Sequence, residues 1–263
     1  MLLENKNAVV HGAGGAIGGA VARAFASEGA RVFLAGRGQA SLDRVAAEIA
    51  RAGGAAETAQ VDALDEPAVE AHAAGVAAQA GGIDISFTAI GHGDVHGTPL
   101  LEMPYEEFAR PVNNAIRAQF LTTRAAARQM TKRRTGVIMA ITATTARHVI
   151  PEVGGTGVAF DAIESLCRQW AAELGPLGIR VVWLQTTGIP EAFHDTGGVA
   201  PAYGTGQPMS GDEFVGWLKS NTMLDRLTTL ADVGHTAAFL ASDRAGAMTA
   251  AGVNLSCGSV PTR

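Results

Sequence analysis

A glycine-rich run close to the N-terminus has residues that could bind a phosphate group. It reads His-Gly-Ala-Gly-Gly-Ala-Ile-Gly over positions 11–18 and lies between an expected strand and an expected helix. Glycines allow a tight turn in which backbone N–H groups approach a pyrophosphate, and a helix N-terminus adds partial positive charge. We therefore predict a dinucleotide-binding turn; an ordinary flexible turn is the alternative. The predicted cofactor contacts in this turn are Gly12, Gly14, Gly15, Ala16, Ile17 and Gly18.

Two charged residues further along the chain could select the dinucleotide. Arg37 follows the second expected strand, where a chain that binds NAD usually carries an acid for the ribose 2′-hydroxyl. A guanidinium suits a 2′-phosphate instead, so Arg37 favours NADP over NAD, with a solvated surface charge as the alternative. Asp62, which precedes Ala63 at the end of the third expected strand, could accept a hydrogen bond from the adenine amine. Its alternative role is to cap the following helix.

The elements that must position these residues alternate along the chain. Short β-branched runs predict strands over 7–11, 31–35, 56–61, 83–89, 137–142, 179–184 and 253–256. Longer alanine-rich runs with helical spacing predict helices over 16–27, 42–51, 66–80, 105–133, 157–174, 212–220 and 230–241. This alternation predicts an α/β fold: a single doubly wound Rossmann-type domain over residues 1–263, with a parallel sheet of about seven strands.

Two long loops interrupt the alternation. One spans 91–104, and the other spans about 186–223 and is rich in Gly, Pro and Ser. Both follow the carboxyl end of an expected strand, which is where open parallel sheets bind ligands. Long loops in a compact domain are commonly functional, so we expect the second loop to form a lid over a small-molecule substrate.

The composition excludes several classes of function. The net charge is -5, whereas binding to nucleic acid needs a basic face. No apolar run is long enough to span a membrane, and the N-terminus does not resemble a secretory signal, so a cytoplasmic protein is expected. Cys167 and Cys257 lack metal-ligand spacing, so the sequence predicts neither a metal site nor a disulfide framework.

Over essentially its whole length, the sequence resembles the short-chain dehydrogenase/reductase family. The glycine run resembles the Thr-Gly-x3-Gly-x-Gly of that family, with His11 in place of the Thr and Ala16 in place of the middle Gly. Asp62 matches the adenine-binding acid of the family, and residues 227–258 resemble its C-terminal part. The stretch Thr-Ala-Ile-Gly at 88–91 occupies the place of the family's Asn-Asn-Ala-Gly. The resemblance adds cofactor contacts at Ala63, Ala89 and Gly91.

The resemblance also implies a set of catalytic residues. The family uses a Tyr as general acid, a Lys four residues later that lowers the Tyr pKa, a Ser thirteen residues before the Tyr, and an Asn on the long helix. When residues 164–174 are aligned with the family, the Tyr position falls on Thr156 and the Lys position on Phe160. The Ser position falls on Ala143 and the Asn position on Ala115.

A count of residues excludes a Tyr–Lys pair elsewhere in the chain. The two tyrosines are Tyr105 and Tyr203, the three lysines are Lys6, Lys132 and Lys219, and no Lys follows a Tyr by four positions. A positioned general acid contributes about 10²- to 10⁴-fold in rate, but orientation of cofactor and substrate contributes separately. We therefore predict slow or differently arranged reduction, or no redox reaction.

Other side chains could take over part of the chemistry. His148, after the fifth expected strand, titrates near neutral pH and could serve as the acid, with a solvated loop histidine as the alternative. Thr142 and Thr144 flank the Ser position and could orient a carbonyl group. Thr156 supplies only a weakly acidic hydroxyl, and Arg147 could bind an anionic substrate or form a surface salt bridge.

Three further histidines lie near the same edge of the expected sheet. His92 and His96 follow the fourth strand and His194 lies in the second long loop. Each is interpreted on its own as a bystander, although their concentration at one edge favours a role for one of them.

Three functions remain open at this point. The first is an NADP-dependent oxidoreductase that acts on a small carbonyl-type substrate with a non-standard proton donor. The second is a non-redox lyase, isomerase or cyclase on the same scaffold, and the third is a catalytically silent binding subunit. The resemblance implies a homodimer or homotetramer that associates through the helices at 105–133 and 157–174.

Overall fold

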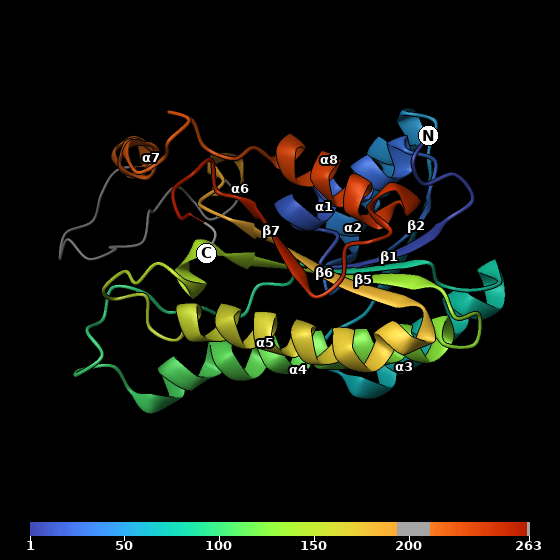
Figure 1. The fold of residues 1–263 in the computed structure, drawn as a ribbon, viewed down its shortest axis with the longest axis horizontal. Helices are drawn as coiled ribbons and strands as arrows, with labels where there is room; N and C mark the ends of the chain where they lie inside the picture. The colour runs from blue at the N-terminus through green and yellow to red at the C-terminus, as the bar shows by residue number, and fades with distance from the viewer. Residues whose placement is uncertain (194–210, 262–263) are drawn as a thin grey trace.

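One parallel sheet of seven strands forms the centre of the molecule, in the order β3-β2-β1-β4-β5-β6-β7 (Figure 1). The computed structural model describes residues 1–193 and 211–261. The strands are β1 (Asn7–His11), β2 (Arg31–Gly36), β3 (Ala55–Gln60), β4 (Ile85–Thr88), β5 (Gly136–Ala143), β6 (Ile179–Thr186) and β7 (Ala251–Leu255). All neighbouring strands pair in parallel, so the predicted fold class is confirmed.

Helices cover both faces of the sheet (Figure 1). One face carries α1 (Ala16–Ser27), α2 (Gln39–Arg51) and α8 (Leu230–Ala241). The other carries α3 (Glu66–Ala80), α4 (Tyr105–Met130) and α5 (Thr156–Leu174). The shorter pieces are α6 (Pro190–Phe193), α7 (Gly211–Ser220), and the 3-10 turns η1 (Thr144–Ala146), η2 (Gly175–Leu177) and η4 (Asp243–Ala245). Among the helices in the described ranges, none is both long and apolar enough to cross a membrane.

The five inner strands are largely buried on both faces because their side chains alternate between two core layers, whereas the edge strands β3 and β7 are partly exposed. In β6, Val182 and Leu184 belong to the core layer that also contains residues of α1 and α8. Val181 and Trp183 of the same strand belong to the layer that contains residues of α4 and α5. Successive side chains of a strand point to opposite faces, so a strand between two helical layers is apolar at consecutive positions. This explains why the strands are visible in the sequence as short apolar runs.

Several element ends differ from the predicted ones. The strand predicted at 179–184 continues to Thr186, because Gln185 and Thr186 pair with β5 and β7 although their side chains are polar. The helix predicted from position 42 begins at Gln39, after the N-cap Gly38, whose residue type provides no side-chain cap. The helix predicted to end at 133 ends at Met130. Of the predicted lid at 186–223, residues 194–210 lie outside the described part of the chain.

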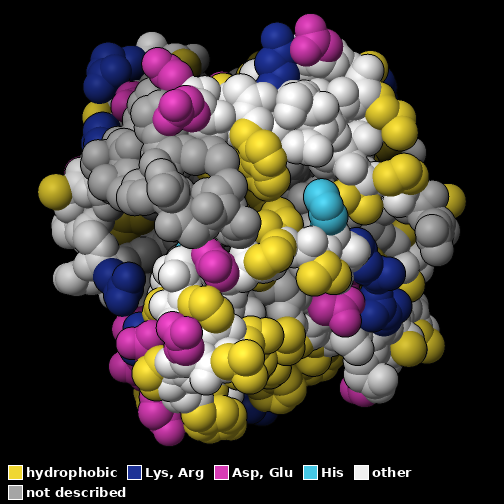
Figure 2. All heavy atoms as spheres, turned by 90° about the vertical axis from the view of Figure 1, so that its left-hand side faces the viewer, with side chains coloured by type: hydrophobic (Ala, Val, Ile, Leu, Met, Phe, Trp, Pro, Cys, Tyr) yellow, Lys and Arg dark blue, Asp and Glu magenta, His cyan; other side chains and the backbone are white. Residues whose placement is uncertain are grey.

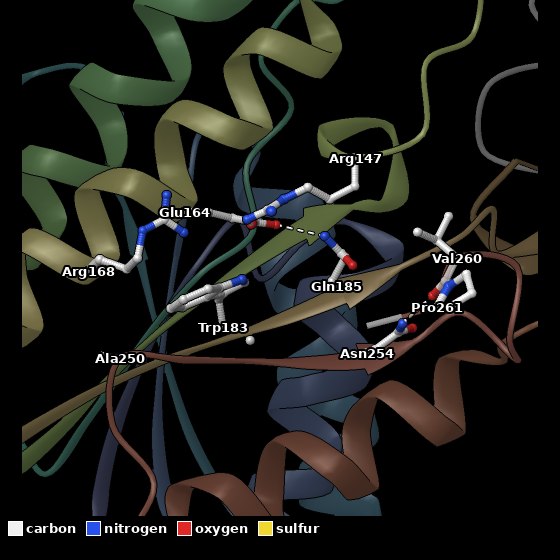
Figure 3. Close-up of a pocket in the computed structure, with 10 residues that line it drawn as sticks. Arg147, Glu164, Arg168, Trp183, Gln185, Ala250, Asn254, Val260 and Pro261 are labelled. Carbon is white, nitrogen blue, oxygen red and sulfur yellow. Dashed lines mark hydrogen bonds and ion pairs between the residues drawn. The ribbon is translucent and has the colours of Figure 1, made fainter. Parts of the chain in front are cut away.

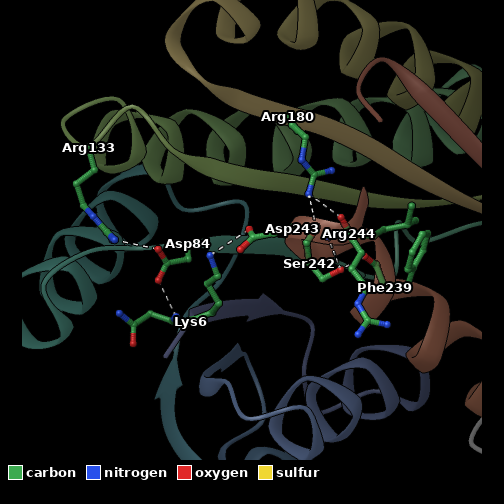
Figure 4. A network of polar contacts seen from close by, with 10 residues as sticks. Lys6, Asp84, Arg133, Arg180, Phe239, Ser242, Asp243 and Arg244 are labelled. Carbon is green, nitrogen blue, oxygen red and sulfur yellow. Dashed lines mark hydrogen bonds and ion pairs between the residues drawn. The ribbon is translucent and has the colours of Figure 1, made fainter. Parts of the chain in front are cut away.

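Polar contacts fix the edge of the sheet at which the strands begin (Figure 4). The Asp84 carboxylate, just before β4, accepts a hydrogen bond from the backbone N–H of Asn7 at 2.8 Å and pairs with Arg133 at 3.1 Å. Arg180, at the start of β6, donates to the carbonyl of Leu240 at 2.9 Å. These contacts hold β1, β4, β6 and α8 together at one end, which leaves the opposite edge for the loops.

Candidate active site

A cleft of about 430 Å³ opens at the carboxyl ends of β1, β2 and β4. β1 pairs with β2 on one side and with β4 on the other. The strands before β4 are added on one side of β1 and the later strands on the other side, although all of them run parallel. Open parallel sheets bind ligands at such a switch point. Figure 2 faces this edge of the molecule and shows a band of hydrophobic side chains down its middle. The cleft is therefore the natural place for the predicted dinucleotide.

The glycine-rich turn forms one wall of the cleft through very close backbone packing. Gly12 has φ +80, and a Cβ built on it would lie 2.1 Å from the carbonyl oxygen of Ala89. A Cβ on Gly18 would lie 2.2 Å from the carbonyl oxygen of Gly12. A larger residue at Gly12 would push the turn away from the end of β4, and one at Gly18 would push α1 away from the turn. Packing thus requires glycine here, independently of any ligand.

The structure brings most of the predicted cofactor contacts together. Eight of them line the cleft: Gly12, Gly14, Gly15, Arg37, Asp62, Ala63, Ala89 and Gly91. Ala16, Ile17 and Gly18 instead form the first turn of α1 and are not among the residues that line it. The N-cap of this helix is Gly15, which provides no side-chain hydrogen bond to the N–H groups of the first turn. Those N–H groups would suit an anion.

The two residues that could select the dinucleotide lie at the rim of the cleft. The Asp62 carboxylate accepts a hydrogen bond from the backbone N–H of Leu64 at 3.0 Å. Asp65, and not Asp62, caps α3, so the helix-cap alternative for Asp62 is wrong. Arg37 is exposed, and its carbonyl accepts a hydrogen bond from Gln60 at 2.8 Å. Within residues 1–193 and 211–261, no carboxylate pairs with the Arg37 guanidinium.

Thr142 makes its contacts within the sheet and α5. Its hydroxyl donates to the buried Glu164 carboxylate at 3.0 Å, and Gln185 donates to the same oxygen at 2.8 Å. Arg147 pairs with the other Glu164 oxygen at 3.1 Å, as the salt-bridge alternative for Arg147 requires. Arg147, Glu164 and Gln185 border a second cavity, of about 660 Å³, between α5, β6 and β7 (Figure 3). The Thr142 hydroxyl is thus bonded to Glu164, which does not support its predicted role of orienting a carbonyl group.

The other candidates on the segment after β5 differ in exposure. Thr144 is buried in η1, and its carbonyl accepts hydrogen bonds from the backbone N–H groups of Arg147 and His148. His148 itself is exposed. The solvated alternative therefore describes His148 better than the predicted acid role.

Among the predicted catalytic residues, Thr156 has a hydroxyl that contacts both an imidazole and a carboxylate. It is buried as the first residue of α5, and its hydroxyl lies between two side chains of the loop that follows β4. Oγ1 of Thr156 is 2.9 Å from Nε2 of His96 and 3.0 Å from Oδ1 of Asp94. Burial lowers the pKa of His96, and the charge of Asp94 partly opposes that shift. A hydroxyl, an imidazole and a carboxylate therefore form one hydrogen-bonded group.

Backbone contacts hold this loop against the start of α5. The N–H of Gly97 donates to the carbonyl of Glu152 at 2.9 Å. A Cβ built on Gly154 would lie 2.7 Å from the carbonyl oxygen of Val95, so the two segments touch through bare backbone. The position of His96 relative to Thr156 is thus determined by the main chain as well as by the side chains.

His92 completes the cluster on the other side. It is buried, its ring lies edge-on to Phe160 with the centroids 5.6 Å apart, and its carbonyl accepts a hydrogen bond from Asn114 at 2.9 Å. Burial lowers the pKa of His92, against the opposing charge of Asp94. The described residues contain no group of three or more His, Cys, Asp or Glu side chains arranged to hold a metal ion.

The sequence alone predicts His92 and His96 to be bystanders and assigns no role to Asp94. The available signal was the alternation His-Gly-Asp-Val-His at 92–96, directly after the fourth strand. The path of a loop that lacks secondary structure cannot be derived from such a pattern, so its contact with Thr156 appears only in the structure.

Residues 12–259 match the model of a protein family described as enoyl-(acyl carrier protein) reductase. The chain belongs to the short-chain dehydrogenase/reductase family. The members of this family are NAD(P)-dependent oxidoreductases, so the cleft and the His92–His96 loop belong to a protein of that class.

Curated relatives of this short-chain dehydrogenase/reductase agree with the match. An uncharacterized oxidoreductase, YxbG of Bacillus subtilis, is 31% identical over 92% of this chain and 86% of its own length. L-rhamnose 1-dehydrogenase (NAD(P)(+)) of Azotobacter vinelandii is 33% identical over 68% of this chain and 72% of its own length.

Solved structures of similar proteins have the same fold as this chain. A short-chain type dehydrogenase/reductase from Mycobacterium marinum superposes with a TM-score of 0.86 at 27% identity, and covers 99% of this chain and 97% of its own. NAD+-bound xylitol dehydrogenase superposes with a TM-score of 0.87, over 98% of this chain and 100% of its own, at 24% identity. At that identity the second likeness establishes the fold alone.

Proposed function

We propose that this short-chain dehydrogenase/reductase is an NADP-dependent oxidoreductase that interconverts a small carbonyl compound and the matching alcohol, with a proton donor other than a tyrosine. The observation that carries the proposal is the cleft at the switch point of the sheet, with the exposed guanidinium of Arg37 at its rim, which pairs with no carboxylate of the described residues. Family membership supports the reaction class.

The residues of the cleft fit a dinucleotide. The Gly12 turn leaves no room for side chains, and the first turn of α1 begins after a glycine that offers no capping oxygen. Packing alone explains the first feature, and the second favours a pyrophosphate at the helix N-terminus. Asp62 would hold the adenine, and Arg37 would pair with a 2′-phosphate. The bound nicotinamide would supply or accept the hydride, and the residues of this chain would orient it and manage the proton.

The preference for NADP over NAD rests on Arg37. The relatives do not agree on one cofactor. The name of the Azotobacter vinelandii dehydrogenase includes NAD(P)(+), and the xylitol dehydrogenase structure is described as NAD+-bound. Similarity to these proteins therefore does not distinguish NADP from NAD. The preference for NADP is inferred from the charge of Arg37 at the end of β2. A cation at that position favours the phosphorylated ribose, whereas an acid would repel it.

Substitution of Arg37 tests the cofactor preference directly. We expect Arg37→Glu to weaken NADPH binding by about 10- to 100-fold, since it replaces a charge-assisted pair with repulsion, and to change NADH binding much less. The measurement is a fluorescence titration of wild type and variant with both reduced dinucleotides. Arg51→Glu, on the exposed end of α2, is the charge-matched control. Equal losses for NADPH and NADH in the Arg37 variant would contradict the assignment.

The non-standard proton donor follows from the residues at the start of α5. Thr156 and Phe160 stand where the family resemblance places Tyr and Lys, and Phe160 cannot supply a positive charge. Turnover of a panel of carbonyl compounds with NADPH tests the redox proposal. Product formation without NADPH oxidation would favour the lyase, isomerase or cyclase. NADPH binding with no reaction at all would favour the silent binding subunit.

We also propose that the molecule associates with itself through α4 and α5. Ile116 and Phe120 lie four residues apart on α4, and each exposes more than a third of its surface. The Phe120 ring lies 5.5 Å from that of Trp170 on α5, and the Trp170 indole N–H is buried without a partner within the described residues. An apolar strip across two packed helices suits a symmetric interface.

A further inference from the structure

The loop after β4 reaches from the cofactor cleft to the start of α5. Gly91 and Gly93 line the cleft, and His96 of the same loop contacts Thr156. The Thr156 hydroxyl lies between an imidazole nitrogen and a carboxylate oxygen, at 2.9 and 3.0 Å. Three groups that can exchange protons therefore lie in one hydrogen-bonded row beside the cleft.

The chemistry of the three groups determines the direction of each hydrogen bond. The ionised Asp94 carboxylate can only accept, so the Thr156 hydroxyl donates to it. A hydroxyl has one proton, so Thr156 must accept from His96. In the neutral ring, His96 therefore carries its proton on Nε2.

We propose that His96, Thr156 and Asp94 form the proton relay of this enzyme; the relay rests on the proposed oxidoreductase function. In the reducing direction, the bound cofactor would supply a hydride to the carbonyl carbon, and the oxygen would become an alkoxide. The Thr156 hydroxyl turns from Asp94 and gives its proton to that oxygen, while it takes the Nε2 proton of the His96 imidazolium. This would leave the alcohol, the oxidised cofactor, the Thr156 hydroxyl and a neutral His96 whose remaining proton is on Nδ1. Uptake of a proton from water at Nε2 restores the imidazolium, and the Thr156 hydroxyl turns back to Asp94.

A relay removes the objection that an aliphatic hydroxyl is too weak an acid. Thr156 never ionises, because it receives one proton as it releases another. The proton comes from the imidazolium, whose ordinary pKa lies near neutrality. Asp94 holds the hydroxyl in line and balances the imidazolium charge, so it is a positioning residue.

The charge of Asp94 acts on the His96 ring, and other titratable or charged groups lie near the backbone of its loop. Asp94 and His92 belong to the same loop, Arg110 of α4 contacts Gly93 of that loop, and Glu152 lies in the turn before α5. Burial lowers the pKa of His96, so the imidazolium is lost at a lower pH than in an exposed histidine. Reduction should therefore slow as pH rises through this pKa, and alcohol oxidation should quicken over the same range.

Nitrogen NMR of the histidine side chains tests the relay without any turnover. We expect neutral His96 to carry its proton on Nε2. We also expect Asp94→Asn to lower the His96 pKa further, since it removes the opposing charge. In the enzyme without dinucleotide or substrate, a neutral His96 with its proton on Nδ1, or a His96 pKa that does not respond to Asp94→Asn, would overturn the relay.

Turnover of the best substrate of the carbonyl panel, with NADPH, tests the catalytic role. We expect His96→Gln and Thr156→Val each to lower kcat by about 10²- to 10⁴-fold, with NADPH binding unchanged. The double variant should be little worse than either single one, because the residues act as one unit. Thr156→Ser should restore most of the rate, and the exposed His235→Gln on α8 should match wild type.

The failures of the relay and of the proposed function can be told apart. If wild type turns over the substrate and His96→Gln keeps both its rate and its pH profile, the relay alone is wrong. If wild type binds NADPH but reduces no member of the panel, the proposed function is wrong, and the relay falls with it. Thermal unfolding of each variant checks that a lost rate does not come from lost folding.

Discussion

Among single residues, His11 has the most unusual electrostatic surroundings. It stands where the family has a Thr, at the end of β1 beside the glycine turn, and it is buried with its Nδ1 unpaired in the described part of the chain. Its ring lies edge-on to that of His72 on α3, with the centroids 6.0 Å apart. Burial first, and the neighbouring His72 second, lower the pKa of His11 to about 3. The folded protein therefore holds this ring neutral over most of the acidic range.

The lowered pKa of His11 predicts a loss of stability in acid. An unfolded histidine takes a proton near pH 6.5, so between that pH and about 3 the unfolded state binds a proton that the folded state refuses. Stability should fall as pH falls through this window, by about 2 kcal/mol between pH 6.5 and 5 from this residue. Urea unfolding of wild type and His11→Thr across that range should show a shallower slope for the variant. An unchanged slope would mean that His11 is protonated in the folded state.

At the scale of elements, the loop after β4 depends on glycine at the turn before α5. Gly154 has φ +57, a conformation that costs about 1 kcal/mol or more for other residues, and its missing Cβ leaves room for the carbonyl of Val95. Glycine therefore permits both the turn and the contact that places His96 beside Thr156.

We expect Gly154→Ala to lower turnover on the order of tenfold or more while NADPH binding changes little, because it pushes the His96 loop off α5. Steady-state kinetics and the dinucleotide titration separate the two effects. Gly75→Ala on α3 is the matched control: its Cβ would meet nothing within 4 Å, and alanine in a helix should add about 0.5–1 kcal/mol of stability. Similar turnover in Gly154→Ala and Gly75→Ala would show that the position of the His96 loop does not depend on the contact between Gly154 and Val95.

Most of the elements were predictable because apolar spacing determines them. β1, α1, α3 and α8 begin and end as predicted, since each lies between clear turn or capping residues. The end of β6 was not predictable, because Gln185 and Thr186 are in the sheet through backbone pairing that polar side chains do not signal.

Part of the candidate site was likewise predictable from the sequence, and part was not. The glycine turn and the residues at strand ends were predictable, because the topology of a doubly wound sheet brings them to one edge. The partners of Thr156 were not predictable, since they depend on the path of a loop. Thr142 shows the converse: its position was predictable from the alignment, but its hydrogen bond to the buried Glu164 was not.

At the scale of the whole molecule, apolar residues remain on the outer side of α4. Arg124 lies over the Phe120 ring at 5.3 Å, but the ring still exposes 38% of its surface. Monomeric proteins seldom leave aromatic strips of this kind uncovered.

We expect the wild type to sediment as a dimer or tetramer, and Phe120→Asp to shift it to a smaller species, because a charge would be desolvated at the interface. Phe239→Asp on α8 is the control, since that ring exposes a similar 41% on the opposite face of the sheet. Analytical ultracentrifugation of the three proteins at several concentrations is the measurement. A monomeric wild type would contradict association through α4 and α5.

The short stretch between Gly91 and His96 takes part in both the proposed cofactor site and the proposed relay. One end of it lines the cleft proposed for the dinucleotide, and the other end carries the imidazole of the proposed relay, with only four residues in between. A change of loop length or of coenzyme fit would therefore displace the acid–base group as well. Efforts to redirect this enzyme to another coenzyme should accordingly leave this stretch intact and alter the far rim of the cleft at Arg37 instead.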